Sequence, residues 1–203
     1  MEGPRLSTRK MVAIVDIDSG INSEALRHTL EDFGYFVIVY GVGRPQDLID
    51  ILQGNTITKF DFIIISCHGE ENGDLIMWEL GEDIYFPDEP RGNYFGFNEV
   101  NKYLALTDTC IIGLGCYLGH EDMAKAFAKN NNIYIAPTDA VDSGGLVFTI
   151  LFFYYLSEKI YSTQCGFDIE TAYKKASAVD AMTGSFILRK QDTACKNYKS
   201  EEL

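Results

Sequence analysis

Short apolar runs recur along most of the chain at the length of β-strands, and segments with helical periodicity separate them. Runs of this kind, continuous in apolar residues and bounded by small or turn-forming residues, are typical of strands buried on both faces of a sheet. Six are present: Met11–Val15, Tyr35–Tyr40, Phe62–Ser66, Thr109–Gly113, Ile133–Ala136 and Ser185–Leu188. The pattern therefore predicts a sheet of about six strands.

The intervening segments place apolar residues three and four positions apart, which is the spacing of an amphipathic helix. They predict helices over residues 25–33, 45–52, 97–104, 120–130, 145–156 and 169–179. Gly34 is expected to end the first helix, and Ser143 to cap the fifth. Strands that alternate with helices indicate parallel βαβ units, so the sequence predicts an α/β fold.

Residues 70–96 interrupt this alternation. Acidic residues, glycines and prolines are interspersed there with two apolar segments, Leu75–Trp78 and Ile84–Phe86. This composition predicts a β-hairpin excursion between the third and fourth strands of the sheet. No internal repeat or linker divides the chain, so residues 1–190 are expected to form a single domain. Residues 191–203 are charged and lack periodicity, which predicts a mobile C-terminal tail.

The charge of the chain indicates which classes of partner it can bind. Its 17 Lys and Arg residues stand against 30 Asp and Glu residues, for a formal net charge of −13. Nucleic-acid binding requires clustered basic side chains, so no nucleic-acid partner is expected. A basic peptide or protein is the partner that this charge favours.

Cysteine usage and the apolar runs indicate the compartment. The five cysteines are odd in number and are not spaced as a disulfide framework, which favours a reducing environment. Residues 1–10 are too polar for a signal peptide, and the longest apolar stretch, Gly145–Leu156, is too short to span a membrane. The sequence thus predicts a cytoplasmic protein with no membrane partner.

Two of the predicted strands lead to residues with catalytic chemistry. The third leads to His68 and Gly69, and the fourth leads to Cys116. If these strands are parallel neighbours, both side chains leave the same sheet edge, where open α/β folds place their sites. A thiol with the usual pKa of about 8.5 is mostly protonated at neutral pH, and a neighbouring imidazole can hold the thiolate. The pair predicts a nucleophilic dyad, with the amides of Gly69 and Cys116 as donors to an oxyanion.

The remaining cysteines are expected to be structural, because cysteine is among the most frequently buried residue types. They are Cys67, Cys110, Cys165 and Cys195. A zinc set of Cys67, His68 and His120 would draw ligands from opposite faces of one strand, and the acidic loop Glu70–Asp74 lacks the ligand spacing of a dedicated calcium site. The sequence therefore predicts no metal and no cofactor.

The segments around the dyad resemble the two signatures of the caspase-like cysteine peptidases, most closely those of the CHAT group. They read Ile-Ile-Ser-Cys-His-Gly, ending at Gly69, and Gly-Leu-Gly-Cys-Tyr-Leu-Gly, ending at Gly119. In that group the histidine also precedes a glycine, and a glycine follows the cysteine three residues later. The 48 positions between His68 and Cys116 agree with the spacing of about 50 in caspases. The resemblance extends from Met11 to about Ala178.

The resemblance does not imply a classical Asp-cutting caspase. Caspases carry Gln-Ala before the cysteine, where this chain has Leu114-Gly115, and a glycine two residues after it, where this chain has Leu118. The resemblance implies a three-layer α/β/α sandwich around a mostly parallel sheet of order 2-1-3-4-5-6. It implies that His68 polarises the thiol and that Cys116 forms an acyl-enzyme. It also implies a protein or peptide substrate, a regulatory protein partner and a role in prokaryotic defence or cell death.

Carboxylates follow two other strands of the predicted sheet. Asp16 and Asp18 leave the first strand, and Asp139 and Asp142 follow the fifth. A carboxylate in a dry pocket would select Arg or Lys before the cleaved bond. Aspartate is also common in turns and helix caps, so both explanations remain for each of the four.

Three alternatives remain. The first is a catalytically silent member of the same fold that serves as a binding or scaffold domain. The second is a flavodoxin-like or receiver-type signalling domain, because Asp16 and Asp18 also suit Mg²⁺ and phosphoryl chemistry. A receiver would require a lysine after the fifth strand, where this chain has Pro137-Thr138-Asp139. The third is a thiol hydrolase or acyltransferase that acts on small molecules through the same dyad.

Overall fold

The computed structural model describes residues 9–17, 23–56, 59–157 and 166–191. Its centre is a six-stranded sheet of order β2-β1-β3-β6-β7-β8. The first five strands in that order are parallel, and β8 is antiparallel to β7. The strands are β1 (Met11–Asp16), β2 (Phe36–Gly41), β3 (Phe62–Ser66), β6 (Cys110–Gly113), β7 (Ile133–Pro137) and β8 (Phe186–Lys190). The expected order and the mostly parallel pairing are confirmed.

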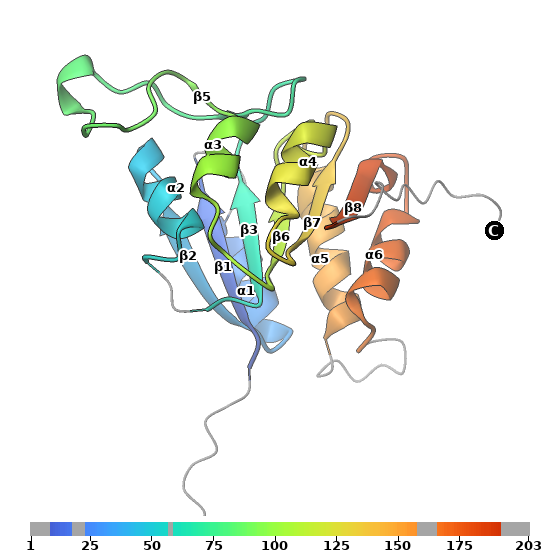
Figure 1. Ribbon diagram of the computed structural model, residues 1–203. Helices are drawn as coiled ribbons and strands as arrows, with labels where there is room; N and C mark the ends of the chain where they lie inside the picture. The colour runs from blue at the N-terminus through green and yellow to red at the C-terminus, as the bar shows by residue number, and fades with distance from the viewer. Residues whose placement is uncertain (1–8, 18–22, 57–58, 158–165, 192–203) are drawn as a thin grey trace, which may run out of the picture.

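Helices cover both faces of the sheet (Figure 1). One face packs against α2 (Pro45–Leu52), α3 (Phe97–Tyr103) and α4 (Glu121–Phe127). The other packs against α1 (Ser23–Asp32), α5 (Gly144–Leu156) and α6 (Ile169–Ser177). The molecule is therefore a three-layer α/β/α sandwich with a separate apolar core on each side of the sheet.

Strand β1 shows why the sequence forms two cores. Its four central residues are fully buried, and because side chains alternate along a strand they divide between the two faces. Ala13 and Val15 join the core beneath α2, whereas Val12 and Ile14 join the core beneath α5. A run without polar positions is what burial on both faces requires.

Helix α5 is apolar around most of its circumference, and its buried large side chains, Phe148, Phe152, Phe153 and Leu156, belong to the second core. Phe148 stacks on Phe186 of β8 with ring centroids 3.9 Å apart. None of the helices in the described part of the chain is long and apolar enough to cross a lipid bilayer.

Some element boundaries differ from those expected. Helix α4 ends at Phe127 and not near residue 130, because Asn130 and Asn131 both take left-handed backbone angles that a helix cannot include. The expected cap by Ser143 is wrong, since its side chain makes no capping hydrogen bond to α5. Helix α6 ends at Ser177, two residues before the expected end.

The excursion between β3 and β6 contains a small second sheet. β4 (Leu75–Ile76) pairs antiparallel with β5 (Tyr94–Phe95), so the predicted hairpin is confirmed in part. Its second strand was placed wrongly, because Ile84 lies in the 3₁₀ helix η1 (Glu82–Ile84) and not in a strand. Figure 1 shows β5 at the end of the sheet toward which the β3 arrow points.

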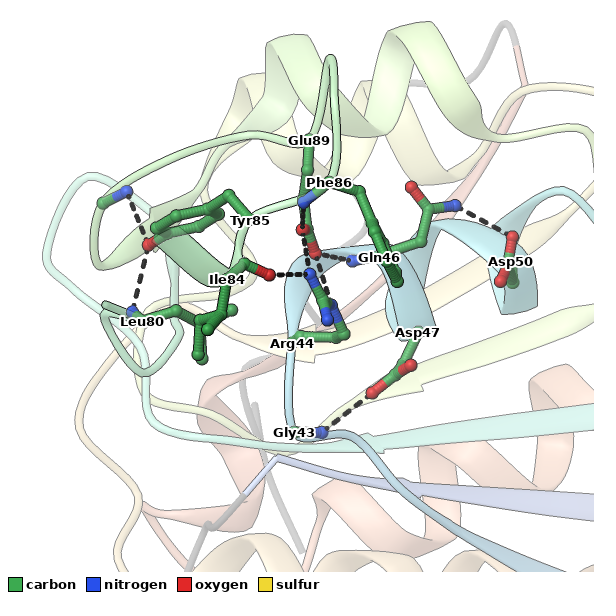
Figure 2. A network of polar contacts seen from close by, with 11 residues as sticks. Gly43, Arg44, Gln46, Asp47, Asp50, Leu80, Ile84, Tyr85, Phe86 and Glu89 are labelled. Atoms are coloured by element: carbon green, nitrogen blue, oxygen red, sulfur yellow. Dashed lines mark hydrogen bonds and ion pairs between the residues drawn. The ribbon is translucent and has the colours of Figure 1, made fainter. Parts of the chain in front are cut away.

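The excursion is attached to the start of α2 by a partly buried ion pair, in which the Glu89 side chain is fully buried (Figure 2). Arg44 donates from Nε and Nη2 to the two carboxylate oxygens of Glu89, at 3.0 and 2.5 Å, and from Nη2 to the carbonyl of Ile84. Its guanidinium also lies 3.8 Å from the ring centroid of Phe86. The Glu89 carboxylate accepts two further hydrogen bonds, from the amides of Gln46 and Phe86. This network holds the excursion against the sandwich.

Candidate active site

The strands that lead to His68 and Cys116 are parallel neighbours. β3 and β6 pair in register from Phe62 with Cys110 to Ile65 with Gly113, and the Leu114 amide donates to the Ile65 carbonyl at 2.9 Å beyond the last pair. Both residues therefore leave the same edge of the sheet, one strand apart. His68 is exposed and Cys116 is half-buried.

Gly69 and Cys116 are in direct backbone contact. A Cβ on Gly69 would lie 2.1 Å from the Cys116 carbonyl oxygen and 3.2 Å from its carbonyl carbon. No side chain fits in that space, so glycine is required for the two chain segments to meet. The carbonyl that approaches Gly69 most closely thus belongs to Cys116 itself.

The amides of Gly69 and Cys116 are free of protein hydrogen bonds among the described residues. The neighbours of Gly69 do pair with the excursion: the His68 carbonyl accepts from the Ile76 amide at 3.0 Å, and the Glu70 amide donates to the Asp74 carbonyl at 3.0 Å. These two hydrogen bonds form an isolated antiparallel bridge between Gly69 and Leu75. Gly69 occupies the non-hydrogen-bonded position of this bridge. Both amides are thus available to an external acceptor.

The loop after β6 is fixed to β7 and to the segment that follows β7. The Tyr117 amide donates to the Asp139 carbonyl at 3.2 Å, and the Gly119 amide donates to the Pro137 carbonyl at 2.7 Å. A Cβ on Gly119 would lie 2.8 Å from the carbonyl oxygens of Ala136 and Pro137, so this close approach also requires glycine. Such bonds hold the Cys116 backbone in one position.

A buried hydroxyl supports the same loop from the core. Tyr134 of β7 is fully buried, and its hydroxyl donates to the Leu118 carbonyl at 3.0 Å. Sequence analysis assigned Tyr134 only to a buried strand. The signal available in the sequence was a tyrosine within an otherwise apolar strand. A buried tyrosine hydroxyl is expected to find a hydrogen-bond partner.

Tyr117, directly after the cysteine, has a left-handed backbone with φ of 59°. Non-glycine residues adopt this region rarely, and such residues cluster at functional sites. Burial raises the pKa of the Tyr117 phenol, and the negative charges of Asp139 and Glu71 raise it further. The phenol therefore lies near the carboxylates of Asp139 and Glu71. The sequence pointed to Asp139 as a site residue but not to Glu71.

The two other cysteines in the described part of the chain are buried, as expected, and differ from Cys116. Burial raises the pKa of Cys67 and of Cys110 to about 12, so both remain neutral thiols at physiological pH. The Cys67 sulfur accepts a hydrogen bond from the Gly115 amide, next to Cys116. Cys165 and Cys195 lie outside the described residues.

The candidate specificity carboxylates flank the dyad on both sides of the sheet edge. Asp16 ends β1, which borders β3, and its carboxylate accepts from the Ser23 hydroxyl at 2.5 Å. Asp139 follows β7, which borders β6, and is exposed. Asp142 is exposed in the turn before α5. Asp18 lies outside the described residues.

Of these residues, Asp139 is bound most directly to the loop after β6 that carries Cys116, because its carbonyl accepts from the Tyr117 amide. Its carboxylate accepts from the Ala140 amide at 2.8 Å, which leaves most of its hydrogen-bonding capacity unused in that contact.

Within the described residues, no three or more His, Cys, Asp or Glu side chains are grouped as a metal site.

Comparison with known proteins identifies the fold. No family profile matches the chain, and no curated protein matches its sequence. Among solved structures, it resembles a secreted C11 cysteine protease from Bacteroides thetaiotaomicron in complex with an irreversible peptide inhibitor, with a TM-score of 0.50 and 10% identity. The chain has a caspase-like α/β fold. The match covers 89% of this chain and 66% of that enzyme, so this caspase-like chain spans about two thirds of the enzyme's length.

A second structure, of the C11 protease from the same organism called iotapain, gives a TM-score of 0.40 at 13% identity. That match covers 81% of this chain and 68% of iotapain. Similarity at that level adds nothing to the assignment. The caspase-like architecture explains why the two strand ends of β3 and β6 meet at one edge.

Proposed function

We propose that this caspase-like chain is a cysteine endopeptidase that acts on a protein or peptide through His68 and Cys116. The observation that carries the proposal is the backbone contact between the segments that follow β3 and β6. In this contact the Cys116 carbonyl lies against Gly69, the residue after His68. The caspase-like fold and its similarity to a peptide-inhibited C11 cysteine protease support it. The sequence signatures favour the CHAT group within this fold, and a role in defence or cell death is proposed on the same resemblance.

In this mechanism His68 takes the proton of the Cys116 thiol, and the thiolate attacks the carbonyl carbon of the scissile peptide bond. The developing oxyanion accepts hydrogen bonds from the unpaired amides of Gly69 and Cys116. The C–N bond breaks, and the departing amine takes the proton from His68. Water then attacks the thioester carbonyl carbon while His68 accepts a proton from the water. The C–S bond breaks to release the acid product, and the proton on His68 returns to the Cys116 sulfur.

The proposed specificity is for Arg or Lys at the residue before the cleaved bond. Asp139 is the residue that best supports this specificity. It adjoins the loop that carries Cys116, and its exposed carboxylate is near the Tyr117 phenol. Asp16, Asp18 and Asp142 are proposed with it as contributors to the negative charge at the same edge of the sheet. An ionised carboxylate pairs with a guanidinium through charge-assisted hydrogen bonds, which favours Arg in particular.

The test is site-specific labelling of Cys116 by an electrophile at neutral pH, with the labelled residue located by mass spectrometry. We expect rapid labelling of Cys116 but not of Cys67 or Cys110, which are buried neutral thiols. His68→Ala should slow labelling and peptide cleavage by about 10² to 10⁴-fold, the usual contribution of general acid–base catalysis. Cys116→Ala should abolish cleavage.

A matched control is available in His28→Ala. His28 is also exposed, but it lies on α1 in the other helical layer and is not proposed to act on the thiol. It should leave labelling and cleavage within about twofold, as expected of an exposed substitution outside the dyad. If Cys116 labels equally fast in wild type and in His68→Ala, the dyad is wrong and the silent scaffold of the same fold is the better explanation.

A further inference from the structure

One face of the β4–β5 ribbon carries two exposed aromatic side chains beside a partly buried isoleucine. Side chains alternate across a ribbon, and here Leu75, Met77 and Phe95 point into the first core. The opposite face carries Ile76 and Tyr94, which are cross-strand partners, and Trp78, two positions beyond Ile76. Trp78 is 62% exposed and Tyr94 is 53% exposed. We call Ile76, Trp78 and Tyr94 the ribbon face.

The ribbon face is held in position by the rest of the excursion. The pairing of the two strands continues through the Met77 amide, which donates to the Asn93 carbonyl at 2.7 Å. Farther out, the Tyr85 hydroxyl accepts from the Leu80 amide at 3.0 Å, and the Arg44–Glu89 ion pair attaches the excursion to α2 (Figure 2). A fixed aromatic surface loses little conformational entropy on binding.

The surroundings of this face are acidic. A hollow of about 390 Å³ beside Tyr94 is lined by Phe97, by the carboxylates of Asp74, Glu99 and Asp122, and by no Lys or Arg among the described residues. Glu79 follows Trp78 in the chain and is exposed. Of these carboxylates, Asp122 also lies 3.9 Å from the Lys125 ammonium, which itself does not line the hollow. An aromatic surface beside an acidic hollow complements a segment that carries both apolar and cationic side chains, since rings and carboxylates each attract a cation.

The ribbon face is connected directly to the proposed catalytic dyad. The Ile76 amide donates to the His68 carbonyl at 3.0 Å, so the ribbon begins where the histidine stands. The hollow beside Tyr94 is also lined by His120, four residues after Cys116. A polypeptide bound at the dyad therefore has a short path to this surface.

We propose that the ribbon face is a docking site for a basic, partly apolar segment of the protein substrate, separate from the residues next to the cleaved bond. Apolar side chains of that segment pack on Trp78 and Ile76, and a Lys or Arg side chain enters the hollow between Tyr94 and the carboxylates. This proposal extends the protease function proposed above. A second copy of this chain is disfavoured as the occupant, because each copy carries a net charge of −13.

The test uses the only tryptophan of the chain as the reporter. Binding is measured on the Cys116→Ala variant of this 203-residue chain, so it does not depend on catalysis. The probe is a short synthetic peptide of Lys, Leu and Gly, and its charge-reversed counterpart has Glu in place of Lys. We expect the Lys peptide to change Trp78 emission saturably and more weakly as salt is added, whereas the Glu peptide has no effect.

Two further variants locate the site. Tyr94→Ser in the Cys116→Ala background should weaken the Lys peptide at least about tenfold, the usual effect of removing an aromatic anchor at an interface. Phe36→Ser is the control, because Phe36 is a 47% exposed aromatic residue at the start of β2, outside the ribbon. It should leave binding unchanged. Equal loss in both variants would overturn the proposal.

Catalysis by otherwise wild-type protein gives an independent result. Trp78→Ser should raise KM for an unfolded basic protein about tenfold and leave cleavage of a short chromogenic peptide unchanged, because the short peptide cannot reach the ribbon. The docking site is rejected if the Lys peptide causes no saturable change, if the Glu peptide binds equally well, or if Trp78 emission depends on the concentration of this chain alone. Absence of cleavage with intact Lys-peptide binding would reject the protease function and not the docking site.

Discussion

The carbonyl oxygen of Cys116 occupies the space that a side chain on Gly69 would need. A Cβ there would lie 2.1 Å from that oxygen, far inside van der Waals contact. The residue after the proposed base and the proposed nucleophile itself are therefore packed against each other. This contact fixes how close the ends of β3 and β6 can come, and with it the relative position of His68 and Cys116.

Gly69→Ala should disable the site without unfolding the sandwich. The new methyl group must push the Cys116 backbone away, and a shift of about 1 Å in a catalytic group can cost about 10²-fold in rate. Labelling of Cys116 and peptide cleavage should fall together by about that factor. Gly81→Ala is the matched control, because nothing lies within 4 Å of a Cβ at that position. Equal activity of the two variants would contradict this account.

Tyr134→Phe should lower both stability and activity. It removes the hydroxyl that donates to the Leu118 carbonyl and leaves that carbonyl unpaired in the core, at a cost of about 1–3 kcal/mol. Urea unfolding measures the loss of stability, and hydrogen exchange at residues 114–119 measures loosening of the loop. Tyr173→Phe deletes another buried hydroxyl, bonded to the Phe186 carbonyl at 2.5 Å. Tyr173→Phe should lower the free energy of unfolding by a similar amount and leave the rate of Cys116 labelling unchanged.

Residue 117 should show the cost of its left-handed backbone. Glycine adopts φ of 59° freely, whereas a β-branched residue is strained there. We expect Tyr117→Val to be less stable than Tyr117→Gly by about 1–2 kcal/mol, measured by urea unfolding. The comparison isolates the backbone, since both variants lack the phenol. A valine variant as stable as the glycine variant would show that this strain is absent in solution.

The Arg44–Glu89 pair predicts a loss of stability in acid. Hydrogen bonding to Arg44 lowers the pKa of Glu89 from about 4.5 to about 2, with help from the amides of Phe86 and Gln46. Because the folded pKa lies below the unfolded one, the stabilisation is complete above about pH 4.5 and is lost as the pH falls toward about 2. Glu89→Gln should remove this part of the pH dependence.

Hydrogen exchange across residues 75–96 at several pH values, or Trp78 emission, reports on the excursion that Glu89 holds. In Glu89→Gln we expect faster exchange at neutral pH and little further change in acid. Glu79→Gln is the control, because Glu79 is exposed. If wild type and Glu89→Gln respond identically to acid, the ion pair does not stabilise the excursion.

Asp139→Asn tests the proposed specificity. The substitution removes a negative charge near the Tyr117 phenol but keeps the main-chain carbonyl that accepts from the Tyr117 amide. Cleavage after Arg or Lys should fall by about 10-fold or more in kcat/KM relative to cleavage after an apolar residue, as for loss of a charged partner. Unchanged preference would assign selection to another carboxylate, and Asp16→Asn is the next variant to measure.

The sequence alone determined much of the architecture. Continuous apolar runs predicted the six strands of the sheet, and helical periodicity predicted the helices between them, because burial on two faces and burial on one face leave different local patterns. The same patterns showed that His68 and Cys116 follow strands. The order of the strands came from the resemblance of two short motifs to a known family and not from periodicity.

Only the tertiary structure revealed the contacts between distant segments. The fit of Cys116 against Gly69, the bond from Tyr134 to Leu118 and the pairing of β4 with Tyr94–Phe95 depend on register and on packing distances. Arg44 and Glu89 lie 45 positions apart, so no local pattern joins them. Periodicity reports which face of an element is buried, but it carries no information about which atoms meet across that face, since that depends on how all the elements pack together.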